Sequence, residues 1–347
     1  MSTRINKRSI TMTDVARHAG VSQTTVSFVL NNNDTPNIPD DTRQRVLDAI
    51  EELGYEPDAR AQALRSGSTK TIALIIPDLR NPHFCEYATG IEEAARAAGY
   101  HLLLSSTTMN DEYAVEIFKD LARRRFDGLI IASSFILEAQ EAQTTLKQIR
   151  ERGLPIVEMD ENYGVDSVCA DYRDATQEVM SYLLSLGHRR IGLIYGVGGH
   201  QLGQDRLQPY LESLHAANIS EPDLIAECGP TIEDGYQASL KLLQLAPRLT
   251  ALIAINDLLA IGAVRAAGDL GLHVPDELSL VGYDDIPMAN YLLPRLTTVT
   301  KDASMLGRKA FEILLARIQN PELPRQQVYS PARLIIREST GPVPSKR

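Results

Sequence analysis

From Thr71 onward the chain alternates short apolar runs with amphipathic segments, and this alternation restricts the fold more than any other feature. The apolar runs are TIALIIPD, HLLLSST, GLIIASS, PIVEMD, IGLIYG, LIAEC, ALIAIN and LSLVGYD. Strands that alternate with helices form parallel sheets covered by helices on both faces. Open sheets usually have about four to six strands, so this number of runs predicts two sheets in two lobes, with a crossing near Gly164 to Asp166.

Polar residues end several of these runs. They are Asp78, Asp160, Asn256 and Asp284. In doubly wound sheets a ligand binds in the crevice outside the carboxyl ends of the strands, so these side chains are candidate ligand contacts. Purely structural roles stay open for two of them, because Asn256 could cap the following helix and Asp284 could simply form a turn.

The segment before about residue 54 has a different, short helical pattern. A first helix capped by Thr11 or Thr13 ends before Gly20, and Ser22 can cap a second helix. A third helix fits TRQRVLDAIEEL. In a helix-turn-helix arrangement the second helix enters the major groove of DNA by its N-terminal end. This segment is therefore predicted to be a DNA-binding head.

The outward face of the second helix carries side chains that suit DNA. In VSQTTVSFVLNNN, Thr24 and Phe28 are four residues apart and point away from the apolar face of the helix. Gln23 can pair with adenine, while a threonine methyl group or a phenylalanine ring can contact the methyl group of thymine. The residues placed to bond phosphates are Ser22, Thr25, Ser27 and Asn31.

A plainer role for this helix stays open. The head could be a small helical bundle whose polar face only contacts water, with Phe28 packed on the third helix. The two roles differ in where the phenylalanine ring lies.

The charge of the chain restricts how it can bind DNA. With 35 basic and 45 acidic side chains the formal net charge is -10, which disfavours indiscriminate binding to nucleic acid or to acidic membranes. Near the N-terminus, however, Arg4, Lys7, Arg8 and Arg17 outnumber Asp14. DNA contact is therefore expected to be local to the head.

Cysteine content and hydropathy exclude several other classes of protein. Cys85, Cys169 and Cys228 are an odd set at wide spacings, so neither a disulfide framework nor a zinc site is expected, and no other metal or cofactor is suggested. The N-terminus has no apolar segment of the signal-peptide type, and no run of about eighteen apolar residues occurs. A cytoplasmic protein with no membrane partner is therefore expected.

A set of motifs along the chain resembles the lactose/galactose repressor (LacI/GalR) family. They are TMTDVARHAGVSQTTVSFVLNNN, DTRQRVLDAIEELGYEPDARAQALRSG, IALIIPDLRNPHF, LGHRRIGLIYG, AINDLLAIGAV, HVPDELSLVGYDD, RLTTV and LIIREST. They occur in the family's order and cover nearly the whole chain. The resemblance implies an all-α helix-turn-helix head followed by an α/β core of two doubly wound lobes, similar to periplasmic binding proteins.

The resemblance also implies the domain limits. The head covers 1–56, a hinge helix and linker cover 57–70, the N-terminal lobe covers 71–164 with about 298–326, the C-terminal lobe covers 165–297 with about 327–340, and 341–347 form a tail. That tail is too short for the leucine heptads that join dimers into tetramers in some relatives, so a homodimer is expected.

For DNA binding the resemblance implies roles for residues in two segments. Gln23 and Thr24 occupy the family's base-reading positions. Phe28 stands where the family very often has an arginine that bonds guanine, so the operator half-site is expected to differ from that of typical relatives. In the hinge helix, Ala61 and Leu64 are implied to enter the minor groove, where an inserted apolar side chain unstacks bases and bends the duplex.

For the core the resemblance implies a small-molecule effector bound between the lobes. The implied contacts are Asp160, Arg206, Asn256 and Asp284, and because the chain has no tryptophan, Phe84 or a tyrosine is expected to stack on a sugar face. Carboxylates and a guanidinium group suit a polyol because each can engage two vicinal hydroxyl groups. A neutral or weakly charged sugar or sugar derivative is implied.

Two other classes of protein fit the sequence less well. YGVGGHQLG could cradle a phosphate in a nucleotide-using enzyme, but its glycines lack the dinucleotide spacing and no P-loop lysine follows. A transport binding protein would share the core but not the head. The sequence therefore predicts a transcriptional repressor without catalytic activity, which binds a near-palindromic operator as a homodimer under the control of the effector. Whether the effector induces or corepresses stays open.

Overall fold

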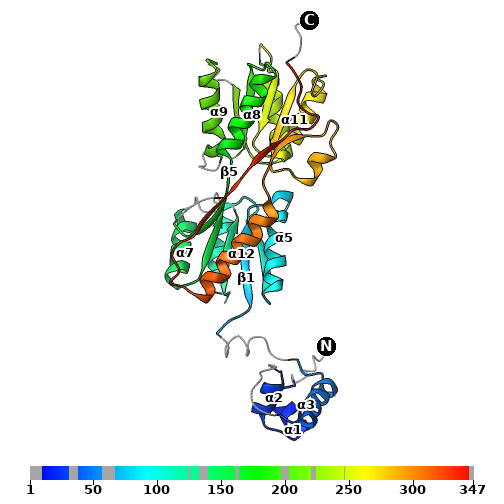
Figure 1. Ribbon diagram of the computed structural model, residues 1–347, viewed down its shortest axis with the longest axis vertical. Coiled ribbons are helices and arrows are strands. Elements are labelled where there is room, and N and C mark those ends of the chain that lie inside the picture. Colours follow the sequence, from blue (N-terminus) through cyan, green and yellow to red (C-terminus); the bar gives the residue numbers. More distant parts are fainter. Residues whose placement is uncertain are drawn as a thin grey trace, which may run out of the picture. The chain divides into compact units, whose positions relative to one another are not determined.

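The computed structural model describes residues 10–30, 38–56, 67–123, 126–132, 140–160, 164–196, 203–219, 224–245 and 247–343. The chain divides into two compact units, Met1–Thr69 and Lys70–Arg347. Each unit has its own hydrophobic core, and Figure 1 shows the helices of the first unit and the two sheets of the second.

Three helices form the described part of the head: α1 (Met12–Ala19), α2 (Gln23–Leu30) and α3 (Asp40–Leu53). Thr11 caps α1, because its hydroxyl oxygen accepts from the N–H of Asp14 at 3.3 Å while the Asp14 carboxylate accepts from the N–H of Thr11 at 3.0 Å. Gly20 ends α1 in the left-handed conformation, with φ 68°. The head's core consists of Val15, Ala16, Ala19, Val26, Val29, Val46, Ala49 and Tyr55. The predicted helix, glycine turn and second helix are therefore present.

The first sheet of the core is parallel throughout. Its order is β11-β5-β4-β3-β1-β2, with β1 (Thr71–Ile76), β2 (His101–Ser106), β3 (Gly128–Ala132), β4 (Ile156–Met159), β5 (Asp166–Asp171) and β11 (Gln327–Pro331). Within this sheet Leu74 of β1 lies opposite Leu104 on one side and Ile130 on the other. Because side chains alternate along a strand, Leu74 and Ile75 belong to different hydrophobic clusters.

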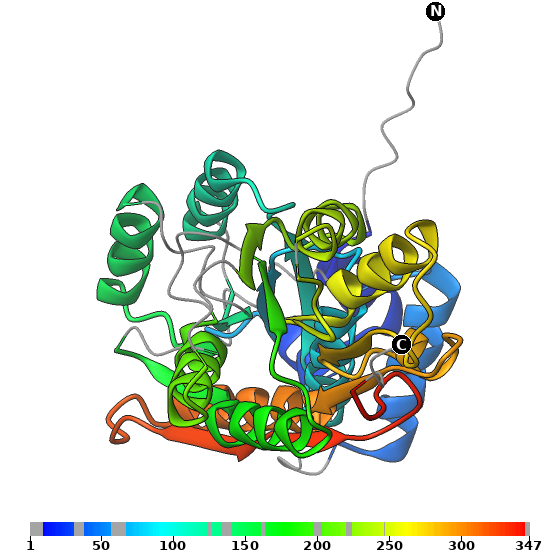
Figure 2. The same cartoon turned by 90° about the horizontal axis from the view of Figure 1, so that it is seen from above.

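Helices cover both faces of this sheet (Figure 2). On the face of Leu74 lie α5 (Pro82–Ala97) and α12 (Ala303–Gln319), and on the face of Ile75 lie α6 (Asp111–Arg123) and α7 (Gln140–Glu151). The first pair of helices packs closely because Gly90 has no side chain. A Cβ at this position would lie 2.0 Å from the carbonyl oxygen of Ser304.

The second sheet has the order β12-β10-β9-β8-β6-β7. Its strands are β6 (Ile191–Gly196), β7 (Ile225–Cys228), β8 (Ala251–Ala254), β9 (Ser279–Tyr283), β10 (Thr297–Thr300) and β12 (Arg333–Ile335), and its helices are α8 (Arg173–Ser185), α9 (Gln204–Ala216), α10 (Ile232–Leu243) and α11 (Asp257–Asp269). Neighbouring strands are parallel except β10 and β12. In the described residues the strands thus form two sheets of six strands each.

The chain passes from one lobe to the other at Tyr172, at Lys301 and at Ala332 (Figure 1). Each of these crossings lies directly after a strand, so a side chain placed there is close to the carboxyl ends of strands in both lobes.

The crossings lie several residues after the positions expected from the sequence, which were 164–166, about 298 and about 327. The first difference arises because the sequence DSVCAD of β5 is too polar to be recognised as a buried strand. Its Asp166 is buried, and it is stabilised because Arg317 of α12 donates from Nε to its carboxylate at 2.9 Å.

Candidate functional site

The second helix of the head, α2, presents the polar side chains that the sequence indicated. Gln23 and Thr24 are exposed, and Ser27 is half-buried. Ser22 holds the start of the helix, since its hydroxyl oxygen accepts from the N–H of Thr25 at 3.1 Å and bonds the Thr25 hydroxyl at 2.9 Å. The Gln23 amide donates to the hydroxyl of Thr13, which joins α2 to α1.

Phe28 is half-buried and lies outside the hydrophobic core of the described head. This position disfavours the alternative in which its ring packs in that core. The base contact expected of Phe28 stays a prediction. Asn31, Ala61 and Leu64 lie outside the described residues.

Within the second unit, polar and aromatic side chains from both lobes meet in one group, which we call the interlobe cluster. Its members are His83, Tyr87, Asp160, Tyr172, Arg206, Tyr283, Asp284 and Lys301. They come from α5, from the ends of β4 and β9, from α9 and from two of the crossings. Every member is buried except Asp160 and Arg206, whose side chains are only 12% and 11% exposed.

The protein itself engages both carboxylate oxygens of Asp160. The Tyr87 hydroxyl donates to them at 2.8 and 2.9 Å, and the Lys301 ammonium group donates to Oδ1 at 3.2 Å. Burial by itself lowers the pKa of Lys301, but Asp160, Tyr172 and Asp284 together outweigh this effect, and the net pKa is raised. Lys301 therefore stays charged, and it forms a buried salt bridge with Asp160.

Burial by itself lowers the pKa of the Arg206 guanidinium group, but nearby charges and aromatic rings stabilise the charged group, and the net pKa is raised. Its guanidinium carbon lies 3.8 Å from the ring centroid of Tyr172 and 5.4 Å from that of Tyr283, which is a cation-π arrangement. Its ion pair with the neighbouring Asp205 is 3.4 Å long. The buried Nε atom has no hydrogen-bond partner among the described residues. Because a buried unsatisfied donor costs about 1–3 kcal/mol, a ligand that offers an acceptor would bind favourably there.

Asp284 is the open carboxylate of the cluster. His83 Nδ1 approaches its Oδ1 at 3.7 Å, which is too far for a hydrogen bond. Burial raises the pKa of Asp284, while the charges of Lys301 and Arg206 lower it. Burial, followed by the charge of Lys301, holds the pKa of His83 well below its usual value, so this imidazole is neutral.

Asp257 holds the backbone next to this open carboxylate. It is buried, and its oxygens accept from the Thr298 hydroxyl at 2.7 Å and from the N–H of Ile286 at 2.9 Å. The turn between β9 and Ile286 places Asp284 at a φ of 100°, a conformation that few non-glycine residues adopt. Asp257 is therefore a positioning residue for the Asp284 turn.

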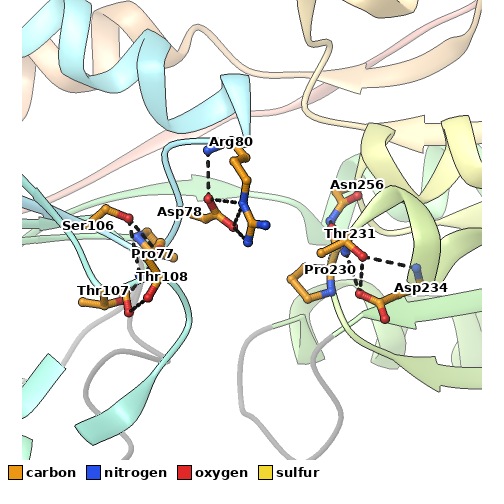
Figure 3. A network of polar contacts seen from close by, with 10 residues as sticks. All are labelled: Pro77, Asp78, Arg80, Ser106, Thr107, Thr108, Pro230, Thr231, Asp234 and Asn256. Carbon is orange, nitrogen blue, oxygen red and sulfur yellow. Dashed lines mark hydrogen bonds and ion pairs between the residues drawn. The ribbon is translucent and has the colours of Figure 1, made fainter. Parts of the chain in front are cut away.

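The two other expected effector contacts are placed differently. Asn256 caps α11, with its side-chain oxygen accepting from the N–H of Leu259 at 2.8 Å. It lies beside Pro230 and Thr231, and Figure 3 shows this group of the C-terminal lobe facing the bonded pair Asp78 and Arg80 of the N-terminal lobe. Phe84 is 8% exposed, and its ring centroid lies 5.2 Å from that of His83.

The structure adds residues that the sequence analysis did not single out. They are His83, Tyr87, Tyr172, Asp257, Tyr283 and Lys301. Four of them lie in or beside motifs of the family, RNPHF, AINDLLAIGAV, HVPDELSLVGYDD and RLTTV, which could have drawn attention to them. Nothing in their neighbouring sequence shows that they are buried beside charged groups.

The described residues contain neither a metal site nor a membrane-spanning helix. No group of three or more His, Cys, Asp and Glu side chains could hold a metal ion there. Over the same part of the chain, no helix is both long enough and apolar enough to cross a membrane.

Comparison with protein families gives two matches that together span the head and most of the core. Residues 11–58 match the bacterial regulatory proteins of the lacI family, and residues 180–340 match the periplasmic binding protein-like domain. The chain is 34% identical to the HTH-type transcriptional regulator DegA of Bacillus subtilis (strain 168) over 338 residues, which cover 96% of this chain and 98% of DegA. It is 32% identical to the HTH-type transcriptional repressor PurR of Mannheimia succiniciproducens over 333 residues, which cover 95% and 98% of the two chains.

Solved structures are similar to this chain over about four fifths to nearly all of its length. The lac repressor dimer bound to operator and the anti-inducer ONPF has a TM-score of 0.85 at 28% identity, covering 96% of this chain and 100% of the other. A complex of the transcriptional regulator CelR with cellobiose has a TM-score of 0.71 at 28% identity and covers 95% and 99%. A regulator from Enterococcus faecium with bound ribose has a TM-score of 0.70 at 30% identity and covers 79% and 99%. The predicted fold class, a helix-turn-helix head with a core of two parallel-sheet lobes, is confirmed.

Proposed function

Because the chain belongs to the lacI family of bacterial regulatory proteins, we propose that it is a transcriptional repressor whose binding to operator DNA is controlled by a small-molecule effector. In this role it acts in the cytoplasm and catalyses no reaction. The relatives named above are DNA-binding transcriptional regulators, and they support the proposal.

The proposed effector is a sugar or a sugar derivative held between the lobes. The observation that carries this proposal is the pair of open groups in the interlobe cluster. Asp284 offers a buried carboxylate, and Arg206 offers a buried Nε donor that has no partner in the described residues. A polyol contains both donors and acceptors, so it can satisfy both groups at once. The bound cellobiose and ribose of similar structures support this class of ligand.

Phe84, Asp160 and Asn256 remain proposed effector contacts with a smaller share of the binding. Asp160 is already bonded to Tyr87 and Lys301, and Asn256 caps α11, so each has only part of its hydrogen-bonding capacity left. Phe84 would supply apolar surface to the carbon face of a sugar ring.

On DNA, two heads of a homodimer would read the half-sites of a near-palindromic operator. Gln23, Thr24 and Phe28 are proposed to contact bases. The proposed phosphate contacts are Ser22, Thr25, Ser27 and Asn31, and the proposed minor-groove contacts are Ala61 and Leu64 of the hinge. The similar lac repressor structure is a dimer bound to operator, which supports this arrangement.

An exposed apolar segment of the C-terminal lobe supports the dimer. Tyr291 and Leu293 are 86% and 90% exposed, and the nearby Met288 is 39% exposed. Large apolar side chains grouped in this way are typical of a surface that another protein covers. We assign a second copy of the chain as the partner. Effector binding would then change how the two copies position their heads on DNA. Effector and operator would therefore change each other's affinity by one coupling free energy.

A thermal-shift screen of the full chain against sugars, followed by operator titrations with each stabilising sugar, tests this function. At least one sugar should raise the melting temperature and change the operator affinity by about 5-fold to 150-fold, the usual range of allosteric coupling. The proposal fails if no sugar stabilises the protein, or if the stabilising sugars leave operator affinity unchanged.

A further inference from the structure

The second crossing between the lobes places a lysine in an unusual position. Lys301 follows β10 directly and precedes Asp302, the N-cap of α12. Its side chain is only 2% exposed. Burying an ammonium group is costly, so the surrounding groups must replace the water that it has lost.

Three side chains form a cation site around this ammonium group. Its Nζ atom lies 3.2 Å from Asp160 Oδ1, and 5.0 and 4.9 Å from the ring centroids of Tyr87 and Tyr172. A carboxylate with two aromatic rings is a combination that binds ammonium ions in proteins. The site comes from the N-terminal lobe and the first crossing, whereas the lysine follows a strand of the C-terminal lobe.

The other carboxylate of the interlobe cluster has no such occupant. Within the described residues the nearest basic side chain to the Asp284 carboxylate is the neutral His83, at 3.7 Å. His83 Nδ1 and Arg206 Nε are both buried and have no hydrogen-bond partner in that part of the chain. The cluster therefore has one closed side, at Asp160, and one open side, at Asp284.

We propose that Lys301 is a specificity-determining residue of the effector site, because its ammonium group permanently occupies the cation site of Asp160, Tyr87 and Tyr172. This inference rests on the proposed function, since it concerns the same effector. The effector is then held on the open side by Arg206, His83 and Asp284. It carries no ionised amino group towards Asp160, because that position is filled and a second positive charge would be repelled by Lys301.

The variant Lys301→Ala tests the proposal by emptying the site. The substitution removes the atoms beyond Cβ, which together have the size and charge of an n-propylammonium ion. The melting temperature of the full chain is measured without DNA or sugar, in n-propylammonium chloride and in sodium chloride of the same concentration. We expect the variant to melt below the wild type, and n-propylammonium to raise its melting temperature by several degrees in a saturable way.

Two controls accompany this variant. The wild type and Lys309→Ala, which removes a partly exposed lysine of α12, should show no specific response to n-propylammonium. Lys301→Met fills most of the space but leaves Asp160 without its cation, so it should melt at a lower temperature and should not respond. n-Propanol, which has the size of the ion without its charge, should not stabilise Lys301→Ala.

A further variant keeps the test decisive if Lys301→Ala does not fold. Lys301→Met combined with Asp160→Asn removes both charges, so it should melt above Lys301→Met alone. The proposal is overturned if n-propylammonium stabilises a folded Lys301→Ala no more than the wild type, or if the double variant is no more stable than Lys301→Met. Neither measurement uses sugar or operator. A negative result would therefore overturn the inference about Lys301 without bearing on the proposed function.

Discussion

The head and the interlobe cluster hold their functional side chains in opposite ways. In α2, Gln23 and Thr24 are exposed, and the apolar core beneath them does not include them. In the interlobe cluster, Arg206 and Lys301 are almost fully buried, lie against aromatic rings and are each paired with a carboxylate. Substitutions on the first surface should therefore change recognition with little loss of stability, whereas substitutions in the second should change both.

The largest expected effect on stability comes from a substitution at Gly282, the glycine of β9 that lies two residues before Asp284. A Cβ at Gly282 would lie 2.1 Å from Asp257 Oδ1, and that carboxylate cannot move without losing its bonds to Thr298 and Ile286. Gly282→Ala should therefore lower the free energy of unfolding by about 3 kcal/mol, measured by urea titration. It should also weaken the effector response, because the Asp284 turn is displaced.

Gly54→Ala in the head is the matched control for this substitution. A Cβ there would meet nothing within 4 Å, so the only cost is the left-handed backbone, with φ 60°. That cost is about 1 kcal/mol. If Gly282→Ala and Gly54→Ala lowered the free energy of unfolding equally, the close contact between Gly282 and Asp257 would not be the cause of the loss.

The next effect concerns base recognition by Phe28. Phe28→Ala should lose about 1–3 kcal/mol of discrimination at one symmetric pair of operator positions, because a contact with thymine methyl groups is removed. Phe28→Arg should move the preference at those positions from A·T towards guanine. Selection of binding sites from random DNA measures both changes, and thermal melting of the variants shows whether the head stays folded.

The alternative for Phe28 makes the opposite forecast. If the ring were a core residue, Phe28→Ala would cost about 3–5 kcal/mol of stability. If Phe28→Ala destabilises the head and leaves its base preference unchanged, Phe28 is a packing residue and not a base contact. The contrast between an exposed recognition surface and a buried cluster would then not hold for this residue.

A smaller effect is expected from the buried imidazole of His83. Burial, and then the charge of Lys301, lowers the pKa of His83 in the folded protein. As the pH falls below about 6.5 the unfolded chain therefore takes up a proton before the folded protein does, and stability is lost towards acid pH by at most about 1.4 kcal/mol per pH unit. Above that pH the contribution is fully present.

His83→Phe should remove this contribution. Unfolding free energies measured between pH 7 and pH 5 should then fall less steeply in the variant than in the wild type. His18→Phe changes an exposed histidine of the head and serves as the control. Identical slopes for the wild type and His83→Phe would contradict the assignment of a buried neutral imidazole.

The sequence was sufficient for the fold class because the strongest strands are short apolar runs that can be recognised locally. It failed at strands whose polar residues are satisfied by distant partners. β5 contains the buried Asp166, which is paired with Arg317. β10 reads TTVT, and its Thr298 bonds the buried Asp257. Neither partner is near in sequence, so the polar pattern of these strands does not show that they are buried.

The candidate site was only partly predictable for the same reason. Asp284 and Arg206 were singled out as candidate contacts through strand ends and the family resemblance, and they stay predictions. Lys301 was not singled out, because a lysine after a strand is normally a surface residue, and the carboxylate that stabilises it is 141 residues away. The environment of Lys301 is thus created by the tertiary fold and is not visible in the neighbouring sequence.

We propose that operator and effector bind to different units of the chain and that their binding is coupled. Operator affinity of the wild type and of Arg206→Ala, measured by fluorescence anisotropy with and without a stabilising sugar, tests it most directly. Sugar should change the wild-type affinity by about 5-fold to 150-fold. Arg206→Ala should bind operator as the wild type does without sugar and should not respond to sugar. An Arg206→Ala protein that still responds to sugar like the wild type, or that loses operator affinity without sugar, would contradict this coupling.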